Sequence, residues 1–317
     1  MKKLLSILLM CFTILALASC GSKNVEKYDV VSTNFIGYDI SKYLAPELKC
    51  DMLLKPGEDL HEYSPTVNDI EKVINSKLFI YIGGETDKEF VEKDILKEVN
   101  KKKTKVISLM EVVKESNIGH IYNEEDPESY IGEDEEEEEE YDEHVWTSID
   151  NVNAIANALY KAIDEITGTG HFKRHEQFVC NELDLLRNKI KNTIDSSSKK
   201  PLIFADRFPL LYFVKEFNLE YDAAFKGCES AKEANPKTIE KLTQKIIDND
   251  IDTIFVIELS EAKIANTIVE ECKRKGKNVT VRTFYTMHNI SKEDFEAGKT
   301  YLDFMNMNVE SLRIALN

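Results

Sequence analysis

The sequence lacks paired cysteines at zinc-type spacing, an excess of basic residues and any internal repeat. Four of its six cysteines lie beyond the N-terminal segment, widely separated, at Cys50, Cys180, Cys228 and Cys272. This spacing argues against a cysteine-based structural zinc module. One or two disulfides are possible if the chain is exported, and the sequence does not assign their pairing.

Basic residues are too few for a protein that binds nucleic acid. Without residues 1–19 the chain has 39 Lys and Arg against 58 Asp and Glu, a formal charge of −19. Such a balance disfavours a polyanionic partner and suits the binding of cations. The remaining length of about 298 residues, in a chain that is 42% hydrophobic, predicts two domains with substantial cores.

The N-terminal hydrophobic run is too short to span a membrane. Met1-Lys2-Lys3 precedes an apolar stretch from Leu4 to Leu17, and Ala18-Ser19-Cys20 follows. This pattern predicts a secretory signal peptide over residues 1–19. It resembles a bacterial lipoprotein signal, in which Cys20 would become the acylated first residue and anchor the protein to a membrane. The alternative is an ordinary cleaved signal with a chance cysteine.

An acidic run is the most unusual stretch of the chain. Ten of the eleven residues from Glu133 to Glu143 are carboxylates, interrupted by Tyr141, and the run ends at His144-Val145-Trp146 with the only tryptophan. Like charges repel one another, so residues 133–143 are expected to form a solvated, disordered loop. Carboxylates and imidazoles also bind divalent cations, and we expect a metal held partly by His144.

Strands and helices alternate in two series, which predicts an α/β fold. Expected strands are 28–33, 52–54, 78–82 and 106–109, then 202–205, 221–225, 253–258 and 279–284. Expected helices are 36–44, 66–75, 90–99, 149–166, 172–194, 210–217, 236–249, 261–274 and 299–315. We therefore predict two parallel-sheet lobes joined by one long helix. The expected boundaries are a signal peptide 1–19, an N-terminal lobe 20–167, a connecting helix 168–200 and a C-terminal lobe 201–317.

Four candidate ligands fall at or just after strand ends: His61, Asp206, Glu258 and His288. In open α/β sheets, ligands bind beyond the carboxyl ends of the strands. This shared position indicates one site.

Two motifs resemble those of a known family. Residues 55–66, KPGEDLHEYSPT, resemble the Pro-Gly-x-x-x-His-x-Tyr-x-Pro-(Thr/Ser) loop of zinc and manganese solute-binding lipoproteins of ABC importers. His144-Val145-Trp146 resembles that family's Asp-Pro-His-Val-Trp motif, and residues 300–308 resemble its last helix. The acidic run stands where zinc members often have a His-rich loop. The similarity extends over nearly all of the mature chain.

The resemblance implies two lobes joined by a rigid helix, a metal in the cleft between them, and no catalysis. It implies His61 and His144 as ligands from the first lobe. The second half departs from the family pattern, because Ala205 occupies the usual histidine position and Asp206 is the nearest ligand type. Asp206 could instead form a salt bridge or a helix cap near Arg207. The stretch 284–289 lacks the usual acid but offers His288, with Glu258 in reserve.

The expected function is extracytoplasmic capture of a divalent transition metal, Zn²⁺ before Mn²⁺, and its delivery to an ABC permease. The protein would be a monomer, lipid-anchored to a bacterial cell membrane, with no nucleic-acid partner. A surface adhesin that binds metal is a further alternative. A zinc hydrolase is disfavoured because the sequence has no His-Glu-x-x-His helix and no clear general base.

Overall fold

The computed structural model describes residues 26–58, 62–116, 119, 141–170, 172–198, 200–225, 227 and 235–317. The predicted acylation site Cys20, the expected ligand His61 and residues 133–140 of the acidic run lie outside these ranges.

The first lobe is built on a sheet of four parallel strands in the order β2-β1-β3-β4. The strands are β1 (Val30–Ser32), β2 (Cys50–Met52), β3 (Leu78–Tyr81) and β4 (Lys105–Ser108). Val30 of β1 stands opposite Cys50 on one side and Leu78 on the other. The central strands β1 and β3 are almost wholly buried, as expected for a parallel sheet covered on both faces.

The second lobe repeats this topology with the order β6-β5-β7-β8, again all parallel. Its strands are β5 (Leu202–Phe204), β6 (Tyr221–Ala223), β7 (Thr253–Ile257) and β8 (Thr280–Phe284). In each lobe the strand order reverses beside the first strand, between β1 and β3 and between β5 and β7. Ligands of α/β proteins bind at such switch points, so the topology directs attention to the loops that follow these strands.

Helices cover both sheets. Those of the first lobe are α2 (Phe35–Leu44), α3 (Val67–Ile74), α4 (Glu85–Phe90), a π-helical turn η2 (Val91–Ile95), α5 (Leu109–Glu115), a 3₁₀ turn η3 (Val145–Thr147) and α6 (Ile149–Thr167). The long α7 (Lys173–Asp195) follows. Those of the second lobe are α8 (Leu211–Glu216), α9 (Pro236–Asp248), α10 (Lys263–Arg274), α11 (Lys292–Glu296) and α12 (Tyr301–Ala315).

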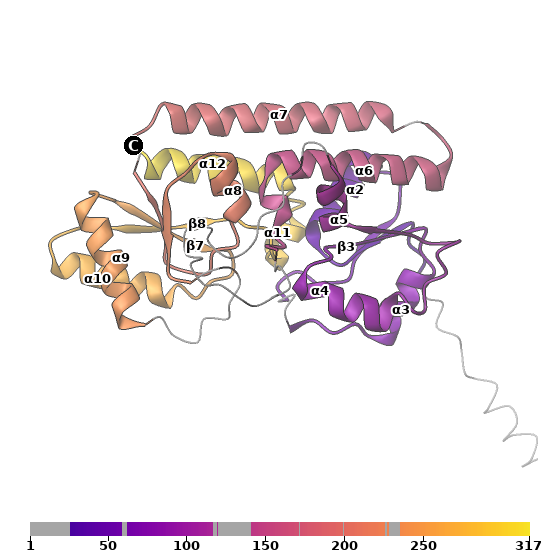
Figure 1. The fold of residues 1–317 in the computed structure, drawn as a ribbon, viewed down its shortest axis with the longest axis horizontal. Helices are drawn as coiled ribbons and strands as arrows, with labels where there is room; N and C mark the ends of the chain where they lie inside the picture. The colour runs from indigo at the N-terminus through magenta and orange to yellow at the C-terminus, as the bar shows by residue number, and fades with distance from the viewer. Residues whose placement is uncertain are drawn as a thin grey trace, which may run out of the picture.

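Helix α7 extends along both lobes, with α6 and α12 beneath it (Figure 1). Its buried residues Val179, Leu183, Leu186 and Ile190 recur at helical spacing and form one apolar stripe. Arg187 of α7 makes ion pairs with Asp150 of α6 and Glu216 of α8. The connecting helix is therefore fastened to both lobes along its length.

The hydrophobic core is continuous across the lobes. One buried cluster contains residues of the first sheet, of α6 and α7, and of the second sheet and α12. Two smaller clusters cover the outer face of each sheet, one around Phe79 and one around Ile254. The α/β prediction with two parallel-sheet lobes is confirmed.

The structure differs from the sequence prediction between Gly84 and Val99. The predicted helix 90–99 instead begins at Glu85 and passes into the π-helical turn at Val91. Gly83 and Gly84 follow β3, which ends at Tyr81, and Gly84 is the N-cap residue of α4. Glu85 and Asp87 then favour the first turn through the helix dipole. The short helices α5 and α11 were not predicted.

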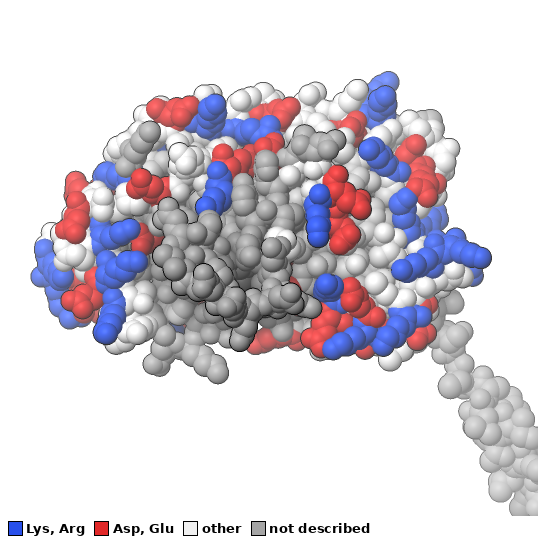
Figure 2. Space-filling view, in the orientation of Figure 1, with Lys and Arg blue, Asp and Glu red and all other residues white. Residues whose placement is uncertain are grey.

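The surface in Figure 2 shows Lys and Arg interspersed with Asp and Glu over the described part of this face. Such mixing produces no broad field of one sign there. Among the described residues, no helix has both the length and the apolar character needed to cross a bilayer.

Candidate metal centre

The segment before α6 holds His144 in a fixed orientation. His144 is fully buried, and its backbone N–H donates to Oδ1 of Asp142 at 2.7 Å. Its ring atom Nδ1 lies 2.9 Å from the same oxygen. Because a carboxylate only accepts hydrogen bonds, Nδ1 carries the proton and the ring lone pair resides on Nε2. Asp142 thus selects the tautomer in which Nε2 can bind a metal.

Trp146 fastens this segment to the second lobe. Its indole Nε1 donates to the carbonyl of Thr286 at 2.8 Å, and the Tyr301 hydroxyl donates to the carbonyl of Trp146 at 3.2 Å. The ring centroids of Trp146 and His144 are 5.3 Å apart, edge to face. The indole therefore forms a wall of the site and joins the two lobes beside it.

His288 is presented by the loop after β8, and Glu258 holds that loop. The Glu258 carboxylate accepts from Thr286 N and Thr286 Oγ1, both at 2.7 Å, and from Asn289 N at 3.4 Å. Burial raises the pKa of Glu258, while the Thr286 hydrogen bonds and the neighbouring His288 act in the opposite direction. Met287 has a φ of 56°, a left-handed conformation that is costly for this residue type. These contacts fix the loop that aims His288.

His144 and His288 meet at the junction of the two lobes. Their ring centroids are 5.3 Å apart at an interplanar angle of 41°. Together with Glu143 they offer three ligand atoms that all lie within 4.8 Å of one another. Among the described residues this is the one group of three or more His, Cys, Asp or Glu side chains so arranged. Ligand atoms around tetrahedral zinc lie about 3.3 Å apart, so these atoms would have to approach one another by up to about 1.5 Å to enclose an ion.

Glu143 also contacts the start of α4. Its Oε2 accepts from Thr86 N at 2.9 Å, and its Oε1 accepts from the Thr86 hydroxyl. A Cβ on Gly84 would lie 2.3 Å from Cβ of Glu143, so glycine is required for this close approach. The Glu143 carboxylate therefore satisfies a backbone N–H of the first turn of α4 while lying beside both imidazoles.

Asp87 stabilises the turn before α4. It accepts from Thr33 Oγ1 at 2.7 Å, from Ile82 N at 2.6 Å and from Gly83 N at 2.8 Å. Burial raises the pKa of Asp87 to about 7, and the neighbouring Glu143 adds to the increase. Asp87 thus shapes the turn against which Glu143 rests.

Only two of the predicted ligands are brought together among the described residues. His144 and His288 come together, whereas His61 lies outside the described residues. Asp206 is not in the group: its Oδ1 accepts from Arg207 N at 2.8 Å, and its buried Oδ2 has no hydrogen-bond partner among the described residues. Glu258 lies near His288 but uses both oxygens to hold the loop.

Sequence reasoning did not single out Glu143 or Asp142 as site residues. Both adjoin His144 and were grouped with the acidic run. Their position was the one available signal: Asp142 lies two residues before His144, and Glu143 lies directly before it.

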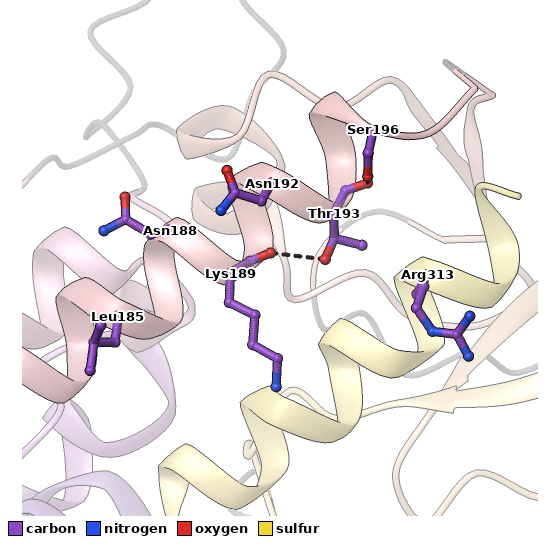
Figure 3. A pocket seen from close by; sticks show the side chains of 7 residues that line it. All are labelled: Leu185, Asn188, Lys189, Asn192, Thr193, Ser196 and Arg313. Carbon is purple, nitrogen blue, oxygen red and sulfur yellow. Dashed lines mark hydrogen bonds between the residues drawn. The ribbon is translucent and has the colours of Figure 1, made fainter.

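A groove of about 470 Å³ lies elsewhere, between α7 and α12 (Figure 3). Lys189 crosses from α7 toward α12, where its Nζ donates to Asn306 at 2.6 Å. The lining residues are Leu185, Asn188, Lys189, Asn192, Thr193, Ser196 and Arg313. Amides, hydroxyls and two cationic side chains do not suit a metal cation, so this groove is not the candidate centre.

Comparison with known proteins finds relatives that are named as metal-binding. The chain is 24% identical to the zinc-binding lipoprotein AdcA of Streptococcus pneumoniae serotype 4, over 99% of this chain and 61% of AdcA. It therefore spans about three fifths of the length of that relative. It is also 24% identical to the manganese ABC transporter substrate-binding lipoprotein PsaA of Streptococcus anginosus, over the full length of both.

The fold is that of solved metal-binding proteins. The periplasmic zinc-binding protein TroA of Treponema pallidum superposes with a TM-score of 0.71 at 20% identity, covering 92% of this chain and 99% of TroA. The model of the family described as zinc-uptake complex component A, periplasmic, matches residues 30–315. That is a family of transport components rather than enzymes, as the sequence predicts. With nearly the whole described chain inside the match, the protein belongs to the family of periplasmic zinc-uptake component A.

Proposed function

We propose that the protein captures Zn²⁺ outside the cytoplasm and delivers it to the permease of an ABC importer. The observation that supports this most is the convergence of His144 and His288, which come from different lobes and lie with ring centroids 5.3 Å apart. Two neutral imidazoles are typical zinc donors. By the motif match, His61 would add a third nitrogen donor from the first lobe.

The arrangement suits binding rather than turnover. Asp142 fixes the tautomer of His144, Glu258 fixes the His288 loop, and Trp146 closes one side. A cargo ion held between two lobes can be released when their local contacts change, without any chemical step. Asp206 would join the ligands only if its side chain moved toward the group.

Mn²⁺ is the second candidate. An oxygen donor, Glu143, lies beside the imidazoles, and manganese accepts carboxylate ligands more readily than zinc does. The relative PsaA is named as a manganese-binding protein. Competition between the two ions decides between them.

The remaining assignments rest on the sequence. Cys20 would carry the lipid anchor on the outer side of the bacterial cell membrane, and residues 20–167, 168–200 and 201–317 would be the first lobe, connecting helix and second lobe. The partners would be the ion and the permease, with the protein acting as a monomer.

The test is metal analysis of protein purified without added metal, followed by zinc titration of variants. His144→Ala and His288→Ala should each lose at least tenfold in zinc affinity, because each removes a coordinating nitrogen. His175→Ala is the matched control, because its Nδ1 contacts the carbonyl of Leu44 at 2.8 Å, outside the group. Parent-like zinc affinity in both site variants would place the site elsewhere.

A further inference from the structure

We propose that Glu143 is a metal ligand of this site and that Thr86, at the start of α4, is the residue that orients it. This inference rests on the proposed metal-binding function and specifies its donor set. The carboxylate donor then comes from the first lobe, from the residue directly before His144.

The geometry supplies the first argument. Glu143 offers a carboxylate oxygen within 4.8 Å of the ligand atoms of both His144 and His288. Its side chain is almost entirely buried, with 4% of its surface exposed. A buried carboxylate needs a compensating positive charge or several hydrogen bonds. The N–H and the hydroxyl of Thr86, which donate to its carboxylate, are both neutral.

Coordination and the contact with Thr86 are compatible. A carboxylate has about four lone-pair directions, and Thr86 occupies one on each oxygen. The remaining directions can accept a cation while both hydrogen bonds persist. A ligating carboxylate that is itself hydrogen-bonded is the usual arrangement in metal sites, because the outer contact fixes the ligand.

The backbone around the site fits this role. Gly84 has no Cβ to obstruct Glu143, and Asp87 anchors the turn that carries Gly84. The start of α4 is therefore shaped to receive the Glu143 side chain. Binding of an ion would tie α4 to the second lobe through Glu143 and His288.

The experiment compares Glu143→Gln and Thr86→Val with the parent, using zinc and manganese titrations and thermal unfolding of the metal-free protein. Glutamine retains an acceptor for Thr86 but removes the charge. We expect Glu143→Gln to lose at least tenfold in affinity, with a larger factor for manganese than for zinc because the lost donor is an oxygen. Thr86→Val, which removes only the hydroxyl contact, should lose a smaller factor for both ions.

The melting temperature of the metal-free protein distinguishes a metal ligand at Glu143 from a residue that only caps the start of α4. Metal-free Glu143→Gln should melt close to the parent, because the cap survives. A large fall in its melting temperature with unchanged metal affinity would overturn the proposal and make Glu143 a cap alone. His144→Ala distinguishes failure of the Glu143 assignment from failure of the proposed metal-binding function. If it loses affinity and Glu143→Gln does not, the metal site stands and the ligand assignment fails; if neither loses affinity, the proposed function fails as well.

Discussion

At the residue scale, the site depends on short-range neighbours of His144 that the sequence presents as ordinary acids. Asp142 and Glu143 are two of ten carboxylates in eleven residues, and nothing in that run marks these two as buried. The structure separates them by their contacts: Asp142 accepts from the His144 ring, and Glu143 accepts from Thr86.

Asp142→Asn tests the orientation of His144. The amide oxygen can still accept one hydrogen bond, but the negative charge that strengthens the imidazole as a ligand is lost. We expect zinc affinity to fall by about 10- to 100-fold, the range for outer-shell partners of metal-bound histidine. Intrinsic fluorescence can follow the titration, because the only tryptophan, Trp146, packs against both imidazoles. Asp69→Asn, in the capping box of α3, is the control and should bind zinc as the parent does.

The site was partly predictable from the sequence. His144 and His288 were candidates because one lies in a family-like motif and the other follows a strand. Their proximity was expected from the family resemblance, whereas the residue pattern alone does not show how two lobes bring together residues 144 positions apart. The sequence also could not predict that Glu258 holds the 286–289 loop, because an acidic residue at a strand end can equally be a metal ligand.

At the element scale, the starts of helices are where the two lobes are joined. Glu216 of α8 accepts from Ile149 N, the first residue of α6, at 2.7 Å. Asp39 of α2 accepts from Tyr301 N, the first residue of α12, at 2.9 Å. In both pairs a carboxylate of one lobe satisfies a backbone donor of the other lobe, where the helix dipole favours negative charge.

Asp39 should make stability depend on pH. Burial raises the pKa of Asp39 from 3.8 to about 6, so the folded state takes up a proton before the unfolded state does. The stabilising contribution is therefore complete below about pH 4 and is lost as the pH rises through 6. Relative to Asp39→Asn, which retains an acceptor without the charge, the parent should gain about 2 kcal/mol between pH 7.5 and pH 4.5.

Urea denaturation at the two pH values measures this difference. Thr300→Ala is the matched control, because it weakens the cap of the same helix with a group that does not titrate. It should cost about 1 kcal/mol at both pH values. A parent-to-Asp39→Asn difference that does not change with pH would show that Asp39 titrates alike in both states.

The order of elements was well predicted because buried strands such as β3 and β7 are short apolar runs bounded by polar or glycine residues. The errors arose where local signals conflict. A glycine pair is a weak signal for a helix start, although Gly84 is the N-cap residue of α4. Helix α11 has no buried residues, so hydrophobic periodicity could not reveal it.

At the scale of the whole molecule, negative charge is concentrated in one stretch. Residues 120–140 contain 12 Asp and Glu and no Lys or Arg, against a net −19 for the chain without residues 1–19. A polyanion next to a metal site raises the local concentration of cations and speeds their encounter, and salt screens this effect.

Deletion of residues 133–140 removes eight of these carboxylates and retains Tyr141 to His144. We expect slower zinc association at low salt, fewer weak sites and a nearly unchanged tight site. Stopped-flow binding at two salt concentrations and calorimetry measure the three quantities. An eight-residue Gly-Ser replacement of 133–140 removes the same carboxylates but keeps the length of the chain, so it is the control for length. Loss of the tight site in both variants would make the run part of the site itself.

The contact between Asp39 and Tyr301 joins residues 262 positions apart, and the shared core also contains residues of α2 and of α12. A chain that emerges from synthesis with its N-terminus first has made α2 long before α12 exists. Until α12 has been made, Asp39 has no Tyr301 N–H to accept from, and the apolar stripe of α7 lacks the part of its cover that α12 supplies. The first lobe therefore gains these contacts only once α12 has been synthesised, and a change that weakens α12 is expected to destabilise the half of the molecule made first.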